Sequence, residues 1–305
     1  MIDFSVVVPV HNSEETLEEL FSRLVVVFGE LGSSFEVIFV EDGGRDDSWN
    51  VLKKLKHEFP DLIKAIKLNK NFGQHNATMC GFTFTKGDKI ITIDDDLQNP
   101  PEEIKKLFEN YQNNRSDVTY GIYTKKQHIF ARNVMSKSAK KSSKFFMKGT
   151  GKGSSFRIIN HKIVKRLLEH NISFIFIDEV LQWYTGNISF ADVEHKKRKH
   201  NKSGYSTRKL FNLASDLTYY YTNIPLKLMV YGGMIISVLS FILALKFIIQ
   251  KFFYDVPTGY TSIIVAILFS TGIIVFSLGI IGGYLSRIQT VQNKKPPFHI
   301  EELLD

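Results

Sequence analysis

Residues 4–42, FSVVVPVHNSEETLEELFSRLVVVFGELGSSFEVIFVED, decide the fold class. Two short runs rich in β-branched and aromatic residues, 4–10 and 35–42, read as strands. The segment between them, 16–31, repeats its apolar residues at helical intervals. A strand, a helix and a second strand in this order form a βαβ unit, whose two strands run parallel.

The same alternation continues along the chain. Segments 63–69 and 89–96 are further strand-like runs, and segments 48–59 and 76–84 have helical character. The pattern predicts an α/β fold with a mainly parallel sheet and helices on both faces. In such sheets ligands bind beyond the carboxyl ends of the strands. Polar clusters follow four of the predicted strands, at His11–Asn12 with Glu14, Glu41–Asp42, Asn71–Asn76 and Asp94–Gln98, and we expect them to share one cleft.

Several functional classes are disfavoured. The residues after the first strand, PVHNSEE, contain no glycine fingerprint for a dinucleotide, and the chain has no Walker motif. Cys80 is the only cysteine, so no disulfide can form within the chain, which favours a reducing compartment. The N-terminus does not resemble a signal peptide. The chain has a net charge of +8 but contains no nucleic-acid-binding motif, so a nucleic-acid-binding function is disfavoured.

Residues 91–104, ITIDDDLQNPPEEI, place three aspartates at the end of a predicted strand. Adjacent carboxylates repel one another unless a cation lies among them. If the chain stays extended, Asp94, Asp96 and Gln98 point to one side. Their oxygens suit Mg²⁺ or Mn²⁺ completed by substrate phosphates. The alternative is a solvated acidic loop that caps the helix predicted at 100–111.

Two uncharged segments lie near the C-terminus. Residues 228–245 and 256–286 contain no charged side chain, and each is long enough to cross a bilayer core of about 30 Å. We therefore expect two transmembrane helices, at about 226–250 and 260–286, that form a hairpin within 225–290. The preceding segment, 206–224, is expected to be an amphipathic helix at the membrane surface, or an ordinary helix packed on the soluble domain.

The distribution of basic residues predicts the orientation of this hairpin. Lysine and arginine are concentrated before the first expected span and after the second, with few near the connection. The positive-inside rule then places a domain of residues 1–205 and a tail of residues 291–305 in the cytoplasm. The lysines and arginines that flank the two expected spans could bind anionic headgroups or an anionic lipid substrate.

Six stretches together carry a family resemblance: PVHNSEETLEEL, VEDGGRDDS, NKNFGQHNATMCGF, DDDLQNPPEEI, RKHNKSGYSTRKL and the C-terminal hairpin. They resemble the family 2 inverting glycosyltransferases of GT-A fold that use polyprenyl phosphate. The similarity is greatest to the undecaprenyl-phosphate aminoarabinose and glucosyl transferases of bacterial envelopes, and weaker to dolichol-phosphate mannose synthase. The resemblance runs from about Val6 to Pro297.

The resemblance implies a role for each cluster in binding a nucleotide sugar, and the expected donor is a UDP-linked sugar. Asp94, Asp96 and Gln98 would hold Mg²⁺ or Mn²⁺ against the diphosphate, where charge develops as the nucleotide leaves, so Asp96 is expected to be catalytic. The expected donor-binding residues are Pro9, His11, Asn12, Glu14, Asp42, Asn71, Gly73 and Asp95. Helix capping or strand-end solvation is the alternative role for these residues.

The acceptor phosphate would be bound by basic residues. In the family, an arginine followed four residues later by a serine holds the lipid phosphate, and Arg132 with Ser136 matches this spacing. On a helix both side chains lie on one face. Lys125 and Arg198 are expected to contact the phosphates as well, and Arg132 is expected to be catalytic. A solvated basic face is the alternative.

The implied reaction is metal-dependent transfer of a sugar, with inversion, from a nucleotide sugar to undecaprenyl or another polyprenyl phosphate. The implied location is the bacterial inner membrane, and the implied assembly is a homotetramer. A membrane-anchored scaffold that binds nucleotide sugars with little catalysis remains an alternative, as does transfer to another lipid. Departures from the family keep these open: Glu41 replaces Asp, Lys125 or Lys126 replaces Arg, Gly283 replaces Glu, and 149–157 lack the usual acid.

Overall fold

The computed structural model describes residues 2–123, 154–169, 176–196, six positions between 231 and 249, 259–292 and 296–305. The chain divides into two compact units. The first contains Met1–Gly204 together with Lys295–Asp305, and the second contains Tyr205–Lys294. The candidate site described below lies entirely in the first unit.

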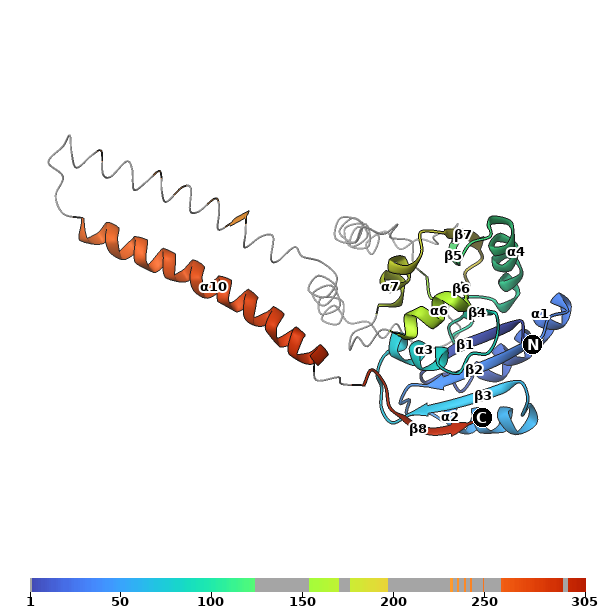
Figure 1. Ribbon diagram of the computed structural model, residues 1–305. Coiled ribbons are helices and arrows are strands. Elements are labelled where there is room, and N and C mark those ends of the chain that lie inside the picture. Colours follow the sequence, from blue (N-terminus) through green and yellow to red (C-terminus); the bar gives the residue numbers. More distant parts are fainter. Residues whose placement is uncertain are drawn as a thin grey trace. The chain divides into compact units, whose positions relative to one another are not determined.

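Four parallel strands form the centre of the first unit (Figure 1). Their order is β4-β1-β2-β3, and Phe4 of β1 lies opposite Phe35 of β2 on one side and Lys89 of β4 on the other. The bounds are β1 Phe4–Val10, β2 Phe35–Glu41, β3 Ile63–Leu68 and β4 Lys89–Thr92, connected by α1 Leu17–Leu31, α2 Ser48–Glu58 and α3 Gln74–Phe82. The predicted α/β alternation and parallel sheet are confirmed, although β4 ends before the aspartates.

Alternate residues of β1 face opposite layers of helices. Val6 and Val8 belong to the same buried cluster as Leu20 and Leu24 of α1. Val7 points the other way, toward α3, where its side chain leaves no room for a β-carbon on Gly81. This is the period of two that a strand imposes on its side chains. The sheet is therefore covered on both faces, as the sequence predicted.

The other half of the sheet is partly antiparallel. Strand β6, Arg157–Asn160, pairs antiparallel with both β4 and β5, Val118–Tyr123. Strand β7, Ile188–Val193, then adds parallel to β5. Four helical segments accompany these strands: η1 Pro101–Glu103, α4 Ile104–Asn114, α6 His161–Leu168 and α7 Ile177–Tyr184. The sequence analysis predicted the helix at α4 and none of these three strands.

The last residues of the chain return to the first unit. Strand β8, Ile300–Leu304, pairs antiparallel with β3 at the edge of the sheet. Glu301 forms an ion pair with Lys67 at 3.1 Å, and Glu302 accepts a 3.0 Å hydrogen bond from the Trp49 indole. This tail covers an edge that would otherwise expose unpaired backbone groups of β3.

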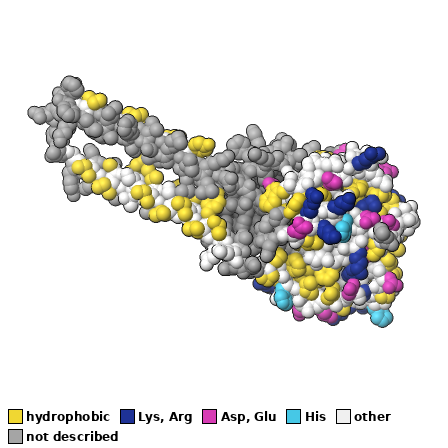
Figure 2. All heavy atoms as spheres, in the orientation of Figure 1, with side chains coloured by type: hydrophobic (Ala, Val, Ile, Leu, Met, Phe, Trp, Pro, Cys, Tyr) yellow, Lys and Arg dark blue, Asp and Glu magenta, His cyan; other side chains and the backbone are white. Residues whose placement is uncertain are grey.

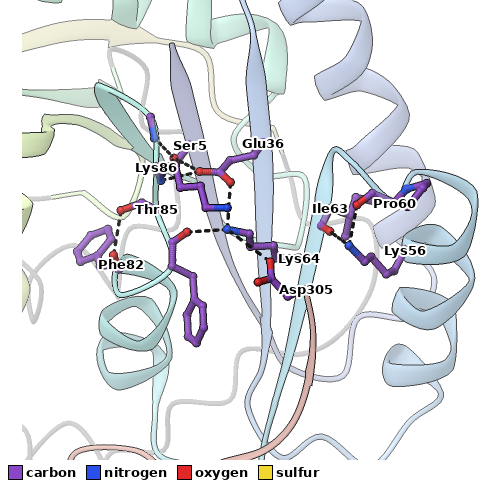
Figure 3. A network of polar contacts seen from close by, with 12 residues as sticks. Ser5, Glu36, Lys56, Pro60, Ile63, Lys64, Phe82, Thr85, Lys86 and Asp305 are labelled. Carbon is purple, nitrogen blue, oxygen red and sulfur yellow. Dashed lines mark hydrogen bonds and ion pairs between the residues drawn. The ribbon is translucent and has the colours of Figure 1, made fainter. Parts of the chain in front are cut away.

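A buried polar network lies near the amino ends of the central strands (Figure 3). Glu36 of β2 accepts hydrogen bonds from the Ser5 hydroxyl and the Lys86 backbone N–H, both at 2.7 Å. Lys64 of β3 lies 3.4 Å from the other Glu36 oxygen and donates to the Phe84 carbonyl at 3.1 Å. Asp305 is a further partner of Lys64, at 3.7 Å. The network ties three strands to the loop that precedes β4.

In the second unit, α10 is a single helix of 33 residues, Tyr260–Gln292. Many of its described apolar side chains are exposed, among them Ile263, Phe269 and Phe276, each with more than three-fifths of its surface accessible. Figure 2 shows hydrophobic side chains along this helix. Over the described parts of the chain, no helix combines the length and the apolarity that a membrane crossing requires. The expected first span, 226–250, and the expected surface helix, 206–224, lie largely or wholly outside those parts.

Candidate functional site

A groove of about 840 Å³ opens at the carboxyl ends of β1, β2, β3 and β4. This is the edge at which parallel α/β sheets bind their ligands. All eight predicted donor-binding residues line it, as do Asp94 and Asp96 of the predicted metal site. The structure therefore gathers the four polar clusters of the sequence into one place. The roles of the individual residues in binding remain predictions.

The loop after β1 is held in shape by the loop after β2. Asn12 adopts a left-handed conformation, with a φ of 55°, and its side-chain oxygen accepts a 2.7 Å hydrogen bond from the backbone N–H of Arg45. Glu14 accepts from the backbone N–H of Asp47 at 2.6 Å, and its own N–H donates to Asp46. Asn12 thus joins two loops of the groove and does not cap α1, whose N-cap residue is Thr16.

The two carboxylates at the end of β2 have different environments. Asp42 accepts hydrogen bonds from the backbone N–H groups of Phe72 and Gly73, at 2.6 and 2.8 Å, one on each oxygen. Burial raises its pKa, and these two bonds oppose the rise. Glu41 accepts from the Gly44 N–H with one oxygen, and its second oxygen is buried without a hydrogen-bond partner among the described residues. Burial raises the pKa of Glu41 as well.

Gly43 allows these loops to meet. It has a φ of 60°, and a β-carbon there would lie 2.4 Å from the Asn71 backbone nitrogen. A side chain would therefore push the β2 loop away from the β3 loop. The first glycine of VEDGGRDDS, Gly43, is required by this close approach, which brings Asp42 within reach of Phe72 and Gly73.

The three consecutive aspartates point in different directions. Asp95 is directed toward the loop after β1, where it accepts from the His11 N–H at 2.9 Å and the Ser13 hydroxyl at 2.6 Å. Burial raises the pKa of Asp95 to about 6 despite these bonds. Asp94 accepts from the Gln74 amide at 2.6 Å and the Ser155 hydroxyl at 2.5 Å. Asp95 thus fixes the loop after β1, and all three aspartates contribute to the lining of the groove.

The expectation of an extended chain from Asp94 to Gln98 is wrong. Strand β4 ends at Thr92, and Leu97 adopts a left-handed conformation with a φ of 57°. Asp96 accepts from the Gln98 backbone N–H at 3.0 Å, which closes a local turn. Gln98 is consequently not among the residues that line the groove, whereas Asp94 and Asp96 are.

The charge of the groove bears on whether it could hold a cation. Arg45 is the only Lys or Arg that lines it within the described residues. The lining carboxylates are Glu14, Glu15, Asp42, Asp46, Asp94, Asp95 and Asp96. A diphosphate would be repelled by such a groove unless a cation intervened. No group of three or more His, Cys, Asp and Glu side chains among those described is arranged to hold a metal ion.

The donor set at the groove fits a hard divalent ion that takes few protein ligands. Asp94 and Asp96 offer carboxylate oxygens at the same edge, and Mg²⁺ commonly binds one or two carboxylates together with substrate phosphates and water. Both carboxylates also accept hydrogen bonds from neighbouring groups, which would orient them. The predicted two-carboxylate part of the metal site is thus chemically reasonable, and Gln98 would have to turn to join it.

The predicted acceptor-phosphate residues lie outside the described residues. These are Lys125, Arg132, Ser136 and Arg198. The sequence analysis missed Arg45 and Asp46, which also line the groove. The sequence could have indicated both residues, because they belong to the charged run that follows the two glycines at the end of β2.

Comparison with known proteins identifies a family and several similar proteins. The profile of the family described as "Glycosyl transferase family 2" matches residues 5–176. A Shewanella sediminis protein named undecaprenyl-phosphate 4-deoxy-4-formamido-L-arabinose transferase is 31% identical, over 99% of this chain and 93% of its own length. A protein of the same name from Pectobacterium atrosepticum is 32% identical, over 98% and 92%.

A solved structure supports the fold alone. Mannosyl-3-phosphoglycerate synthase from Rubrobacter xylanophilus superposes with a TM-score of 0.53 at 12% identity, over 76% of this chain and 75% of that one. The likeness extends over most of both chains, so the arrangement of sheet and helices is a known one. Identity this low carries no information on substrates.

Proposed function

Because this chain belongs to glycosyl transferase family 2, we propose that it transfers a sugar from a UDP-linked donor to undecaprenyl phosphate. One observation carries the choice of acceptor: similarity over 99% of the chain to a relative named for undecaprenyl phosphate. The product is a lipid-linked sugar phosphate for the bacterial envelope. The motif-based resemblance to the family is confirmed, and the acceptor and donor are the proposal.

The groove residues supply the donor site in this proposal. Asn12, Asp42 and Asn71 surround the nucleoside, in a region where the loops are fixed by backbone hydrogen bonds. Arg45 and the carboxylates Asp94 and Asp96 surround the diphosphate. A divalent cation held by Asp94 and Asp96 would neutralise charge on the departing nucleoside diphosphate. Binding in a preformed groove reduces the entropy that must be lost before reaction.

The acceptor needs little activation. A phosphate monoester has its second pKa near 6, so at neutral pH the lipid phosphate is mostly a dianion and already a nucleophile. It attacks the anomeric carbon of the sugar in line with the departing diphosphate, and the configuration inverts. Arg132, Ser136, Lys125 and Arg198 are proposed, from the motif resemblance, to hold the attacking phosphate.

Membrane attachment is part of the proposal. It is supported by the two uncharged segments, 228–245 and 256–286, and by the exposed apolar side chains of α10. The catalytic unit then lies on the cytoplasmic side of the inner membrane, next to its lipid acceptor. Extraction of the expressed protein with carbonate and with detergent tests this, since a spanning hairpin requires detergent for release. A homotetramer is proposed by resemblance, and light scattering in detergent tests it.

The reaction is tested with purified full-length protein, undecaprenyl phosphate and a panel of UDP-sugars, with Mg²⁺, Mn²⁺ or a chelator. Release of UDP that needs both lipid and metal, and that is lost in Asp96→Asn, is the expected result. Diacylglycerol and ceramide serve as alternative acceptors. Donor binding without lipid-dependent release would overturn the proposal in favour of a nucleotide-sugar scaffold.

A further inference from the structure

The last strand of the chain borders the loop that supplies part of the groove. β8 lies beside β3, and the loop after β3 carries Asn71 and Gly73 to the groove lining (Figure 1). Beyond the paired residues, the backbone N–H of Asn69 donates a 3.1 Å hydrogen bond to the His299 carbonyl. No residue of the segment 296–305 lines the groove itself. The tail therefore contacts the groove loop from outside the groove.

The groove loop, residues 69–73, is largely exposed and is held at few points. At its far end, two of its backbone N–H groups donate to the carboxylate of Asp42. Its middle approaches Gly43 so closely that no β-carbon fits there. Its near end bonds to the His299 carbonyl. Exposed segments with few contacts open locally at low cost in free energy, so the shape of this loop depends on each of its anchors.

The pairing of β8 with β3 changes register immediately before its contact with the groove loop. Lys67 lies opposite Glu302, but Leu68 lies opposite Ile300, so Glu301 is one extra residue on β8. Extra residues of this kind bend the strand that carries them and are over-represented next to active sites. The irregular pairing thus occurs at the end of β3 that leads into the groove.

Backbone pairing and one apolar side chain hold the tail in place. Leu304 packs against the core of the first unit, whereas Leu303 is 42% exposed on the other side of the strand. The ion pairs between glutamates of β8 and lysines of the first unit join partly exposed side chains and contribute little. A strand of five residues at the edge of a sheet opens locally, without unfolding of the core.

We propose that β8 is a positioning element of the groove. While β8 pairs with β3, it holds the loop 69–73 in the shape that binds the nucleotide, and when β8 opens, the affinity for the nucleotide falls. The inference rests on the proposed function, because the nucleotide is the proposed ligand of the groove. Binding linkage adds a requirement: the nucleotide must stabilise the pairing of β8 by the same factor by which that pairing raises its affinity.

Hydrogen exchange of the unsubstituted full-length protein tests this linkage. Amide exchange in β8 is measured with Mn²⁺, in the presence and absence of saturating UDP. We expect UDP to slow exchange in β8 at least about fivefold, although β8 does not line the groove. The other edge strand, β7, is the control, and its exchange is expected to change less than about twofold. Equal exchange in β8 with and without UDP would overturn the proposal.

Two matched substitutions test the same coupling in the other direction. Leu304→Asp places a charge against the core and is expected to detach β8, whereas Leu303→Asp makes the same change on the exposed side. The Kd for UDP is expected to rise at least about fivefold in Leu304→Asp and to change less than about twofold in Leu303→Asp. A purely structural role would lower the melting temperature of Leu304→Asp and leave its Kd, measured at low temperature, equal to that of Leu303→Asp.

The outcomes separate the two levels of the proposal. If UDP with Mn²⁺ does not bind to the unsubstituted protein, the proposed function falls, and the positioning role falls with it. If UDP binds and leaves exchange in β8 unchanged, only the positioning role is overturned. Circular dichroism checks the folding of Leu304→Asp, and the exchange measurement on the unsubstituted protein decides the matter if this variant does not fold.

Discussion

Each end of β2 carries a glutamate, and the two are equally buried, but their carboxylates differ in their hydrogen-bond partners. Glu36 and Glu41 are each 3% exposed. Near the amino end, both oxygens of Glu36 have partners, from Ser5, Lys86 and Lys64 (Figure 3). At the carboxyl end, one oxygen of Glu41 has no hydrogen-bond partner among the described residues, and burial raises its pKa.

The difference separates stability from function. A buried carboxylate with a full set of partners stabilises the strands it joins, and removing a partner is costly. Buried carboxylates that lack part of their hydrogen bonds are often found where a protein binds ligands, because the oxygen without a partner can contact the bound ligand. The groove lies at the end that carries Glu41 and Asp42, and the closed network lies near the other.

The largest expected effect is on activity, at the carboxyl edge. Asp96→Asn removes one charge from the proposed metal site and is expected to lower kcat/KM by about 100-fold to 1,000-fold. Its melting temperature is expected to stay within about 2 °C, because Asp96 has no role in the core. UDP release and thermal unfolding of the same preparation measure both. A large fall in melting temperature would mean that the carboxyl edge also stabilises the fold.

The next effect is on stability, near the amino edge. Lys64→Met leaves Glu36 buried without its ion-pair partner and is expected to cost about 3 kcal/mol. For a unit of this size that corresponds to a fall in melting temperature of about 10 °C. UDP affinity measured at low temperature is expected to be unchanged. Loss of UDP affinity in the folded variant would contradict the separation of the two edges.

One substitution made at both ends of β2 gives a direct comparison. Glu36→Gln is expected to destabilise by about 1–2 kcal/mol, because a charge-assisted set of hydrogen bonds is lost. Glu41→Gln is expected to cost little or to stabilise at pH 7, because burial disfavours the charged form of Glu41 and a neutral amide does not carry that cost.

The pH dependence of Glu41→Gln follows from the raised pKa of Glu41. The folded state of the unsubstituted protein holds this proton to higher pH than the unfolded state, so its stability falls as pH rises from about 4.5 through the folded pKa. The glutamine variant lacks this loss. Its melting temperature relative to the unsubstituted protein should therefore rise over the same interval, and a constant difference would show that Glu41 does not titrate in this way.

The smallest effect is expected at the edge strand. Glu301→Gln removes the 3.1 Å pair with Lys67, in which Glu301 is half exposed and water screens the charges. The expected cost is less than about 1 kcal/mol, or a shift of a few degrees in melting temperature at most. A shift as large as that of Lys64→Met would show that β8 is held by charge rather than by its backbone pairing with β3.

The sequence predicted the central βαβ pattern and the place of the site. β-Branched runs and helical periodicity are local features, so strands β1 to β3 and the helices between them could be assigned from neighbouring residues alone. The site followed from the topology, since the carboxyl ends of parallel strands share one edge. All eight predicted donor-binding residues line the groove for this reason.

The tertiary structure decided what depends on contacts between distant residues. β6 and β8 are short strands whose pairing partners lie far away along the chain, and no local pattern reveals them. Within the aspartate run, the bonds from His11 and Ser13 direct Asp95 toward the loop after β1, and the turn at Leu97 removes Gln98 from the groove. The partnership of Arg157 with Asp178 likewise forms only when β6 and α7 pack together. Sequence determined which groups arrive at the edge, because periodicity is local, and folding decided which of them face the ligand, because direction depends on long-range packing.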